Sequence, residues 1–284
     1  MKLKLRAPAK INLFLEVKNR RSDGYHTIES VMQAITLFDE IMIEPRQAGL
    51  SLACSRADLP TDERNLALRA AVFLQRELGI TAGARITLKK VIPLGAGLGG
   101  GSSDAAAVLV GLLKLWKKRL PAERLGRLAA RLGADVPFFL SGGTAIARGI
   151  GEKITPLAGV KSARFVLVYP GFGVSTPWVY QHLHFPLTRK QKITKIKTQL
   201  ASGFPPREWG QYLYNRLEEV VFPAYPVIAR IKEELRQLGC SSLMSGSGAA
   251  VFGLLPSSGD GERIRARLKK QYRDVWLVTS TLQG

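Results

Sequence analysis

Cysteine is scarce in this chain, and long apolar runs are missing. Cys54 and Cys240 are the two cysteines among 284 residues, and they stand isolated, without the spacing of a metal site. Neither a disulfide framework nor a zinc site is indicated. The longest uninterrupted apolar run, residues 105–113, is too short to span a bilayer, and the first residues lack the apolar centre of a signal peptide. We expect a reduced, soluble, cytoplasmic protein with no membrane segment.

Acidic side chains are also few. The chain has 22 Asp and Glu residues against 42 Lys and Arg residues, which gives a formal net charge of +20. Such a charge attracts anions: nucleotides, phosphorylated metabolites, nucleic acid or an acidic membrane surface. Residues 114–131, 189–197 and 263–273 form basic runs, and runs of this kind are usually solvated faces. On composition alone, a basic nucleic-acid-binding module stays open as an alternative.

Glycine, in contrast, is concentrated in one stretch. Residues 93–107 read PLGAGLGGGSSDAAA, with five glycines among residues 95–101. A β-branched run at residues 85–92 predicts a strand before this loop, and an Ala- and Leu-rich run from about Ser103 to Leu115 predicts a helix after it. Glycines let main-chain N–H groups approach a ligand closely, and Ser102 or Ser103 can cap the helix with its positive end facing the loop. This arrangement binds phosphate, and it is favoured over a plain connection.

Two common phosphate-binding motifs are nevertheless absent. Gly95, Gly97 and Gly100 fit the pattern G-x-G-x-x-G, but a dinucleotide-binding fold needs an acidic residue about twenty positions further on. Residues 114–121 contain no acid. A P-loop ends in Gly-Lys-Ser/Thr, whereas Gly101 is followed directly by serine. The loop therefore belongs to another class of phosphate-binding protein.

The first predicted strand, residues 9–17, alternates in polarity. Side chains alternate across a strand, so one face is expected to carry Ile11, Leu13, Leu15 and Val17, and the other Lys10, Asn12, Phe14 and Glu16. On alternation alone, the second face is the solvent side of an edge strand. Periodicity predicts further strands at residues 27–44, 50–54, 144–148, 164–169, 249–255 and 275–282. Helices are expected at residues 62–78, 121–132, 206–221, 226–238 and 262–272.

Three motifs carry a resemblance to a known superfamily. The string Pro-x-x-x-Gly-Leu-Gly-Gly-Gly-Ser-Ser at residues 93–103 resembles the second motif of the kinases that include galactokinase, homoserine kinase, mevalonate kinase and phosphomevalonate kinase, the GHMP kinases. PAKINLFLEV at residues 8–17 resembles the first motif, and LMSGSGAAVFG at residues 243–253 the third. The resemblance implies that the loop wraps the ATP phosphates. The residues implied to bind ATP are Pro93, Leu94, Gly95, Ala96, Gly97, Leu98, Gly99, Gly100, Gly101, Ser102, Ser103 and Asn65. Asn65 can equally be a simple helix cap.

Asp135 stands alone among apolar residues in the segment GADVPFFL, residues 133–140. It can cap a short helix, but GADVPFF resembles the segment in which this superfamily carries its catalytic aspartate. The resemblance implies that Asp135 accepts the proton of an acceptor hydroxyl, while Lys10 keeps the carboxylate ionised and can hydrogen-bond the hydroxyl. Phosphoryl transfer consists mostly of positioning and charge neutralisation. Magnesium is expected with ATP, without a dedicated protein site; Ser103 or Asp135 are the candidate ligands.

Within the superfamily, Lys-Ile-Asn-Leu followed by Asp-Gly-Tyr-His resembles the branch that phosphorylates a cytidine diphosphate conjugate of methylerythritol in the non-mevalonate isoprenoid pathway. In that branch the aromatic residue and the histidine bind cytosine, which suits a stacking ring and an imidazole that can donate and accept. On pattern alone, Tyr25 and His26 are ordinary strand residues after a turn. The residues implied to bind the acceptor are Asn12, Tyr25, His26, Tyr180, Gly246 and Gly248.

The expected fold is α+β with two domains. Residues 1–158 form an ATP-binding α/β domain, and residues 159–284 form a substrate-side domain in which grouped helices and strands resemble a ferredoxin-like arrangement. The active site lies between them. We expect a monomer or weak homodimer that acts on a small molecule and ATP, with no specific nucleic acid and no membrane partner. Another alcohol kinase of the superfamily, a binding-only relative and the basic nucleic-acid-binding module are the alternatives.

Overall fold

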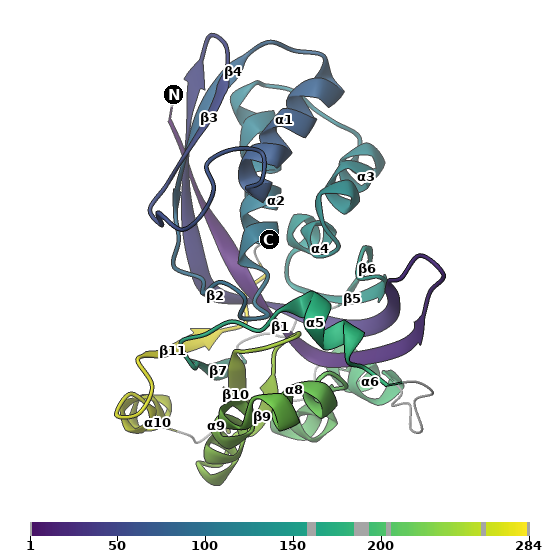
Figure 1. Ribbon diagram of the computed structural model, residues 1–284, viewed down its shortest axis with the longest axis vertical. Coiled ribbons are helices and arrows are strands. Elements are labelled where there is room, and N and C mark those ends of the chain that lie inside the picture. The colour runs from purple at the N-terminus through teal and green to yellow at the C-terminus, as the bar shows by residue number, and fades with distance from the viewer. Residues whose placement is uncertain (1, 158–162, 185–192, 203–205, 257–259, 283–284) are drawn as a thin grey trace.

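The computed structural model describes residues 2–157, 163–184, 193–202, 206–256 and 260–282. These residues form two β-sheets, each covered by helices (Figure 1). The first sheet has the order β3-β4-β2-β1-β8, and β5 and β6 extend it along β2. Its strands are β1 Leu3–Arg20, β2 His26–Arg46, β3 Leu50–Cys54, β4 Gly83–Lys89, β5 Thr144–Gly149, β6 Lys153–Leu157 and β8 Tyr214–Asn215.

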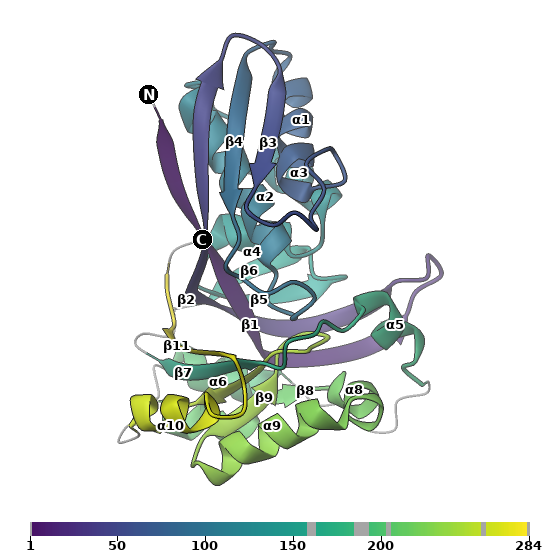
Figure 2. The same ribbon diagram turned by 60° about the vertical axis from the view of Figure 1, so that its left-hand side comes forward.

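Four helices pack together beside the first sheet (Figure 2). They are α1 Leu66–Leu78, α2 Gly100–Leu115, α3 Ala122–Leu132 and α4 Val136–Ser141. The central helix α2 is apolar around most of its circumference because it lies between the sheet and the other helices. Gly111 of α2 lets the helix lie close to the sheet, since an added Cβ would lie 2.4 Å from the end of the Leu5 side chain on β1. The Ala- and Leu-rich run after the glycine loop is thus a buried helix, as predicted.

The second sheet is antiparallel with the order β11-β7-β10-β9. Its strands are β7 Arg164–Tyr169, β9 Ser241–Met244, β10 Val251–Leu254 and β11 Asp274–Thr279. The further helical segments are α5 Thr176–Gln181, α6 Thr194–Ala201, α7 Pro206–Trp209, η1 Gly210–Tyr212, α8 Glu218–Ala224, α9 Pro226–Gln237 and α10 Gly261–Leu268. Helices α8 and α9 come between β7 and β9, and α10 comes between β10 and β11. This is the βαββαβ order of a ferredoxin-like unit, and it confirms the expected arrangement.

The long hairpin of β1 and β2 joins the two halves of the molecule (Figure 2). The end of β2, residues 40–46, pairs with β4 in the first sheet. The middle of the hairpin packs against the second sheet in a shared apolar core. That core contains Ile11 of β1, Phe165 of β7 and Phe252 of β10. Strand β8, from the second half of the chain, pairs with β1. Residues 7–17 of β1 are therefore buried on both faces, and this part of the strand has no solvent side.

The strict alternation expected for β1 is wrong. A register shift between Asn12 and Phe14 in the β1–β2 pairing marks a bulge, and a bulge re-aims the side chains that follow it. Ile11 and Phe14 consequently pack in the shared core, while Leu15 packs in the core of the C-terminal half. Lys10, Asn12 and Leu15 all line the cavity described below.

Several boundaries also differ from expectation. The helix expected at residues 206–221 is broken into α7, η1 and α8, and β8 lies between η1 and α8. The break occurs because Tyr214 and Asn215 are extended and pair with β1. Helix α2 begins at Gly100, and its N-cap is Gly99 with no side-chain cap. The serine cap expected from Ser102 or Ser103 is therefore absent. Strands β6 and β9 and helices α5 and α6 were not predicted, because each is short.

The domain division at 158/159 stays a prediction, since residues 158–162 lie outside the described part of the chain. The basic run at residues 189–197 lies partly outside it as well. Among the residues that the structure describes, no helix combines the length and apolarity needed to cross a membrane.

Candidate active site

A cavity of about 870 Å³ opens where the hairpin, the glycine loop and the second half of the chain meet. Its volume is that of a site for a ligand of nucleotide size. The wall is formed by β1 and β2, by residues 93–102, by the start of α4, by α5 and by Gly246 and Ser247. The cavity thus brings together all three motifs and the aspartate segment, which are distant in the sequence.

Lys10 projects from β1 into this cavity, although its side chain is almost fully buried. The ammonium Nζ lies 3.7 Å from Oδ2 of Asp135 and donates to Oδ1 of Asn12 at 2.6 Å. Asn12 is oriented in turn by donating to Ser30 Oγ at 2.8 Å. Burial lowers the pKa of Lys10, against the opposing effect of Asp135. The prediction that the side chains of Lys10 and Asn12 lie on the same face of the strand is confirmed.

Asp135 immediately precedes α4, in the N-cap position, but its side chain makes no capping hydrogen bond. Its carboxylate remains partly exposed to the cavity and faces Lys10. A carboxylate that is held by an ammonium and has an open side can accept a proton from a bound hydroxyl. Of the two interpretations left open, the structure therefore does not support capping.

The glycine loop turns its carbonyl groups into the protein. The carbonyl of Gly95 accepts from Val174 N at 3.0 Å, that of Gly97 from Ser245 Oγ at 3.1 Å, and that of Leu98 from Lys10 N at 3.0 Å. In a trans peptide unit the C=O and N–H groups point in opposite directions. The N–H groups that follow these carbonyls are therefore turned the other way, toward the cavity that the loop lines. Helix α2 adds the free N–H groups of its first turn.

Two glycines of the loop are required by contacts within the protein. Gly97 has a φ of +73°, and a Cβ there would lie 2.0 Å from the carbonyl oxygen of Ser245. Gly99 has a φ of +72°, and a Cβ would lie 2.9 Å from the ring of Phe139. Gly101 differs, because its φ is ordinary and an added Cβ would meet only Leu66, at 3.6 Å. Gly101 itself lines the cavity.

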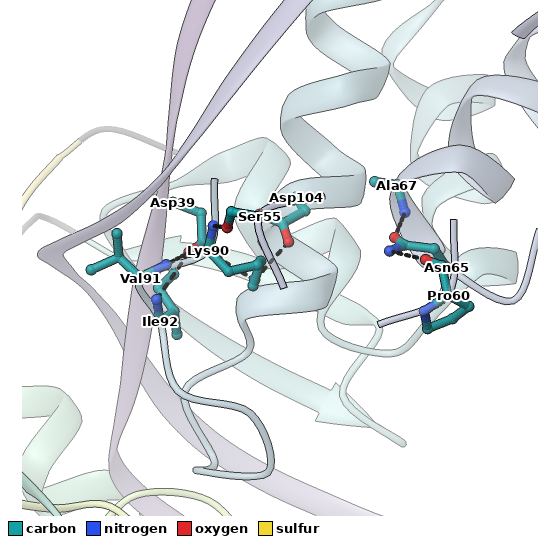
Figure 3. Close-up of polar contacts among 9 residues, drawn as sticks. All are labelled: Asp39, Ser55, Pro60, Asn65, Ala67, Lys90, Val91, Ile92 and Asp104. Carbon is teal, nitrogen blue, oxygen red and sulfur yellow. Dashed lines mark hydrogen bonds and ion pairs between the residues drawn. The ribbon is translucent and has the colours of Figure 1, made fainter. Parts of the chain in front are cut away.

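Ten of the twelve residues expected to bind ATP line the cavity, while Ser103 and Asn65 do not. Ser103 is buried, and its hydroxyl has no hydrogen-bond partner among the described residues. Asn65 caps α1: its side chain accepts from Ala67 N at 3.0 Å and donates to Pro60 O at 2.9 Å (Figure 3). The capping interpretation is therefore confirmed. A contact of Asn65 with ATP stays a prediction, and its neighbour Leu66 lines the cavity.

A buried ion cluster fixes the strand-to-loop junction. Figure 3 shows Lys90, which follows β4, between the carboxylates of Asp39 on β2 and Asp104 on α2. Lys90 Nζ lies 2.7 Å from Asp104 Oδ2, and Asp39 also accepts the N–H groups of Val91 and Ile92 at 2.5 and 2.9 Å. The cluster thus ties the last residues before the loop to β2 and to the first turn of α2.

The charges in this cluster do not balance, since two carboxylates face one ammonium. Burial raises the pKa of Asp104 to about 7, and Asp39 adds to this effect while Lys90 opposes it. Burial alone would lower the pKa of Lys90, but Asp104 and Asp39 raise it. Asp104 Oδ1 has no hydrogen-bond partner among the described residues. Lys90 lies directly under the helix start, because a Cβ on Gly100 would be 3.1 Å from its Nζ.

The residues predicted to bind cytosine also lie at the cavity. His26 and Tyr180 stack on one another, with ring centroids 5.1 Å apart and an interplanar angle of 27°. Burial and the charge of Asp135 raise the pKa of Tyr180, and burial and Arg20 lower that of His26. Tyr25 is 61% exposed, on the turn before β2. All three side chains line the cavity, and the stacked rings of His26 and Tyr180 leave no gap between them for a planar base.

The glycine-containing loop of the third motif, residues 245–248, forms the remaining wall of the cavity. It is called the third glycine loop below, after its motif. Gly246 lines the cavity, and a Cβ on it would lie 3.3 Å from Lys10 Nζ. Ser247 also lines it and shares a hydrogen bond with Thr176 at 2.7 Å. Gly248 does not line the cavity; it has a φ of +83° and packs against Met244. Gly246 therefore has the expected location, whereas Gly248 shapes the loop from behind.

No group of three or more His, Cys, Asp or Glu side chains that could hold a metal ion occurs in the described part of the chain. The carboxylates on the cavity wall, Asp23 and Asp135, do not form such a group.

Five polar residues around the site were missed from the sequence: Asp39, Lys90, Asp104, Asn215 and Glu218. The first three each stand next to another polar residue (Glu40, Lys89 and Ser103), so the sequence alone does not mark them as a buried cluster. The signal for Asn215 and Glu218 was the spacing Asn-x-x-Glu at the start of a helix, which is typical of a cap.

Comparisons with known proteins agree with the geometry. Residues 65–143 match the family profile of the GHMP kinases N terminal domain, and residues 203–274 match that of the GHMP kinases C terminal domain. A 4-diphosphocytidyl-2-C-methyl-D-erythritol kinase of Synechococcus sp. is 43% identical over 280 residues, covering 95% of this chain and 90% of the relative. One of Pelotomaculum thermopropionicum is 44% identical over 277 residues, covering 97% and 96%.

Solved structures give the same result. A crystal structure of 4-(cytidine 5'-diphospho)-2C-methyl-D-erythritol kinase superposes with a TM-score of 0.83 at 38% identity, covering 98% of this chain and all of the other. Homoserine kinase from Cytophaga hutchinsonii shares the fold at 22% identity, with a TM-score of 0.77 and coverage of 100% and 96%. The chain therefore belongs to the GHMP kinases and, within them, to the family of the 4-diphosphocytidyl-2-C-methyl-D-erythritol kinases.

Proposed function

We propose that this protein transfers the γ-phosphoryl group of ATP to the 2-hydroxyl of 4-diphosphocytidyl-2-C-methyl-D-erythritol, giving the 2-phosphate and ADP. The reaction belongs to the non-mevalonate pathway of isoprenoid precursors. The observation that carries this proposal is the Lys10–Asp135 pair, 3.7 Å apart, in the same cavity as the glycine loop and the His26–Tyr180 stack. The identity of the relatives supports the choice of acceptor.

Asp135 acts as the general base. The acceptor oxygen bonds to the γ-phosphorus while the bond from phosphorus to the β–γ bridging oxygen breaks, and the hydroxyl proton passes to Asp135. Lys10 stays within reach of both the carboxylate and the acceptor oxygen because Asn12 fixes its ammonium. An ammonium in this buried position also neutralises charge that develops on the transferred group.

The glycine loop binds the phosphates of ATP. Its inward-facing carbonyls leave N–H groups directed at the cavity, and the start of α2 contributes its dipole. A magnesium ion bound with ATP would neutralise charge on its phosphates. Magnesium prefers oxygen ligands, and Ser102 and Asp135 would supply such oxygens at the cavity wall.

The acceptor is recognised at its base by Tyr25, His26 and Tyr180. Because His26 and Tyr180 stack on one another, cytosine lies beside this pair, and Tyr25 on the exposed turn supplies a further stacking face. One chain can supply all residues assigned to the site, which is compatible with a monomer or weak homodimer as the working form.

A coupled ADP-release assay tests the proposal. We expect turnover with 4-diphosphocytidyl-2-C-methyl-D-erythritol and none with mevalonate, homoserine or galactose. Robust phosphorylation of one of these three alcohols, without the first, would keep the chain among the GHMP kinases and overturn the proposed acceptor. A nucleic-acid-binding role would instead give DNA affinity that persists at physiological salt.

A further inference from the structure

The third glycine loop contacts both the phosphate-binding loop and Lys10. Ser245 Oγ donates to the carbonyl of Gly97 at 3.1 Å, and the two backbones are so close that Gly97 tolerates no Cβ. Gly246 stands against the ammonium of Lys10. A displacement of residues 245–248 would therefore disturb the phosphate-binding loop and Lys10 together.

Two side chains hold this loop from behind: Asn215 at the end of β8 and Glu218 at the start of α8. Asn215 Nδ2 donates both of its hydrogens, one to the carbonyl of Met244 and one to that of Gly246, each at 2.8 Å. Glu218 Oε1 accepts from Met244 N at 2.9 Å. The backbone just before and within the loop is thus fixed by three hydrogen bonds from residues of a different segment.

Asn215 and Glu218 are themselves fixed. Asn215 Oδ1 accepts from Leu217 N at 3.0 Å, and the residue is 2% exposed. Glu218 Oε2 accepts from Lys232 at 2.6 Å. Each polar atom of the Asn215 amide is therefore used, and an amide is required because it supplies two donors on one side and an acceptor on the other.

The same segment is attached to the strand that carries Lys10. Tyr214 and Asn215 pair in parallel with Phe14 and Leu15 of β1, and Arg216 N donates to Leu15 O at 2.9 Å. The Arg216 side chain binds Glu16 of β1 through Nε at 2.9 Å and Nη2 at 3.0 Å, with both groups buried. Residues 214–218 thus connect β1 directly to the third glycine loop.

We propose that Asn215 and Glu218 are positioning residues for phosphoryl transfer, which set the third glycine loop against Lys10 and the phosphate-binding loop. Neither side chain lines the cavity, so they act through the loop and touch neither ATP nor acceptor. This inference rests on the proposed function, because it concerns the rate of the same reaction.

Asn215→Asp is the decisive variant. It keeps the size of the side chain but replaces the NH₂ group, which donates two hydrogen bonds, by an oxygen. That oxygen would face the carbonyl oxygens of Met244 and Gly246. We expect kcat to fall by about 10-fold to 100-fold, since a displacement of about 1 Å can cost that much. The KM for the cytidine substrate should change less, because the residues that recognise the base lie on the hairpin and α5.

Glu218→Gln is the milder variant and remains informative if Asn215→Asp does not fold. It keeps an oxygen for Met244 N but loses the ionic contact with Lys232, so we expect a smaller loss of kcat in the same direction. Glu233→Gln removes an exposed carboxylate of α9 that contacts Arg236, and it serves as the matched control with unchanged kcat.

Hydrogen exchange measured by mass spectrometry supplies a readout independent of turnover. In both variants, exchange should increase in residues 243–250 and also in residues 93–103, while β4 stays protected. Folded variants with wild-type kcat and unchanged exchange at residues 93–103 would overturn the inference. A wild-type protein inactive on the cytidine substrate would instead contradict the proposed function, and the exchange data would still decide whether the two loops are coupled.

Discussion

Lys10 Nζ lies 3.7 Å from Asp135 Oδ2, and these two groups come from distant parts of the chain: Lys10 from the first strand, Asp135 from the position before α4. The carboxylate does not cap its helix. A buried ammonium that faces a carboxylate with an open side forms a proton acceptor beside a fixed positive charge. The arrangement suits transfer of a phosphoryl group to a hydroxyl.

Asp135→Asn should therefore keep the fold and lose most turnover. Amide and carboxylate have nearly the same shape, but the amide cannot accept the proton, and removal of a general base costs about 10²–10⁴-fold in rate. Steady-state kinetics give kcat, while thermal unfolding and calorimetric titration with a non-hydrolysable ATP analogue verify fold and nucleotide binding. A variant within about threefold of wild-type kcat would remove Asp135 from the catalytic role.

Gly101→Val tests the phosphate-binding loop. A Cβ at this position meets only Leu66, at 3.6 Å, and the φ is ordinary, so the variant should fold while its side chain occupies space in the cavity. We expect affinity for an ATP analogue to fall at least about tenfold, because phosphates displaced by the valine side chain lose hydrogen bonds, and each one to a charged group is worth about 1.5–3 kcal/mol. Calorimetric titration measures this affinity.

Gly126→Val in α3 is the matched control for a valine in a helix, since nothing lies within 4 Å of its Cβ position. It should bind the ATP analogue normally. Equal affinities in both variants would mean that residues 93–103 only connect β4 to α2. Gly99 and Gly100 are poorer choices, because valine there would collide with Phe139 or with Ile92 and Lys90.

Much of the site could be predicted from the sequence because its motifs are local. The glycine loop, Lys10 with Asn12, and Asp135 are each defined by a few adjacent residues. Three features depend on distant partners instead. The bulge after Asn12 arises from pairing with β2, the break before α8 from pairing with β1, and the Lys90 cluster from the meeting of β2, β4 and α2.

Helix caps show the same limit. Serine is the better N-cap by propensity, yet α2 begins at Gly100 with Gly99 as its cap. A left-handed residue was needed at Gly99, because the loop must turn sharply past Lys10 and Phe139. The tertiary contact thus overrides the local preference, and the sequence alone contains no sign of that contact.

The buried cluster predicts an unusual dependence of stability on pH. The pKa of Asp104 is raised to about 7 by burial and by Asp39, against the effect of Lys90. The folded chain therefore holds a proton that the unfolded chain releases at lower pH. This contribution to the free energy of unfolding is present in acid and is lost as pH rises through about 7.

Asp104→Asn has no such proton to lose. The free energy of unfolding of the wild type, minus that of Asp104→Asn, should therefore decrease as pH rises from about 5 to about 8. Urea unfolding at a series of pH values measures it. Glu40→Gln, which removes an exposed carboxylate beside Lys89, is the control and should keep a constant difference. A difference between wild type and Asp104→Asn that does not change with pH would contradict the assignment.

Recognition of the base gives the most specific prediction. Cytosine presents an exocyclic amine as a donor beside an unprotonated ring nitrogen, whereas uracil reverses this pattern. A site whose polar groups match cytosine leaves them unpaired against uracil, which can reduce kcat/KM by about 10⁴-fold. We expect turnover with the cytidine substrate and almost none with its uridine counterpart, measured by coupled ADP release.

His26→Ala should weaken this discrimination. Because His26 lines the base end of the cavity and stacks on Tyr180, its loss should raise the KM for the cytidine substrate about tenfold or more, as expected for one lost polar contact. The KM for ATP should stay nearly unchanged, since the phosphate-binding loop lies elsewhere on the wall. His182→Ala, a histidine of the same region that does not line the cavity, is the control. If His26→Ala raised both KM values equally, or left both unchanged, the base would be bound somewhere other than at His26 and Tyr180.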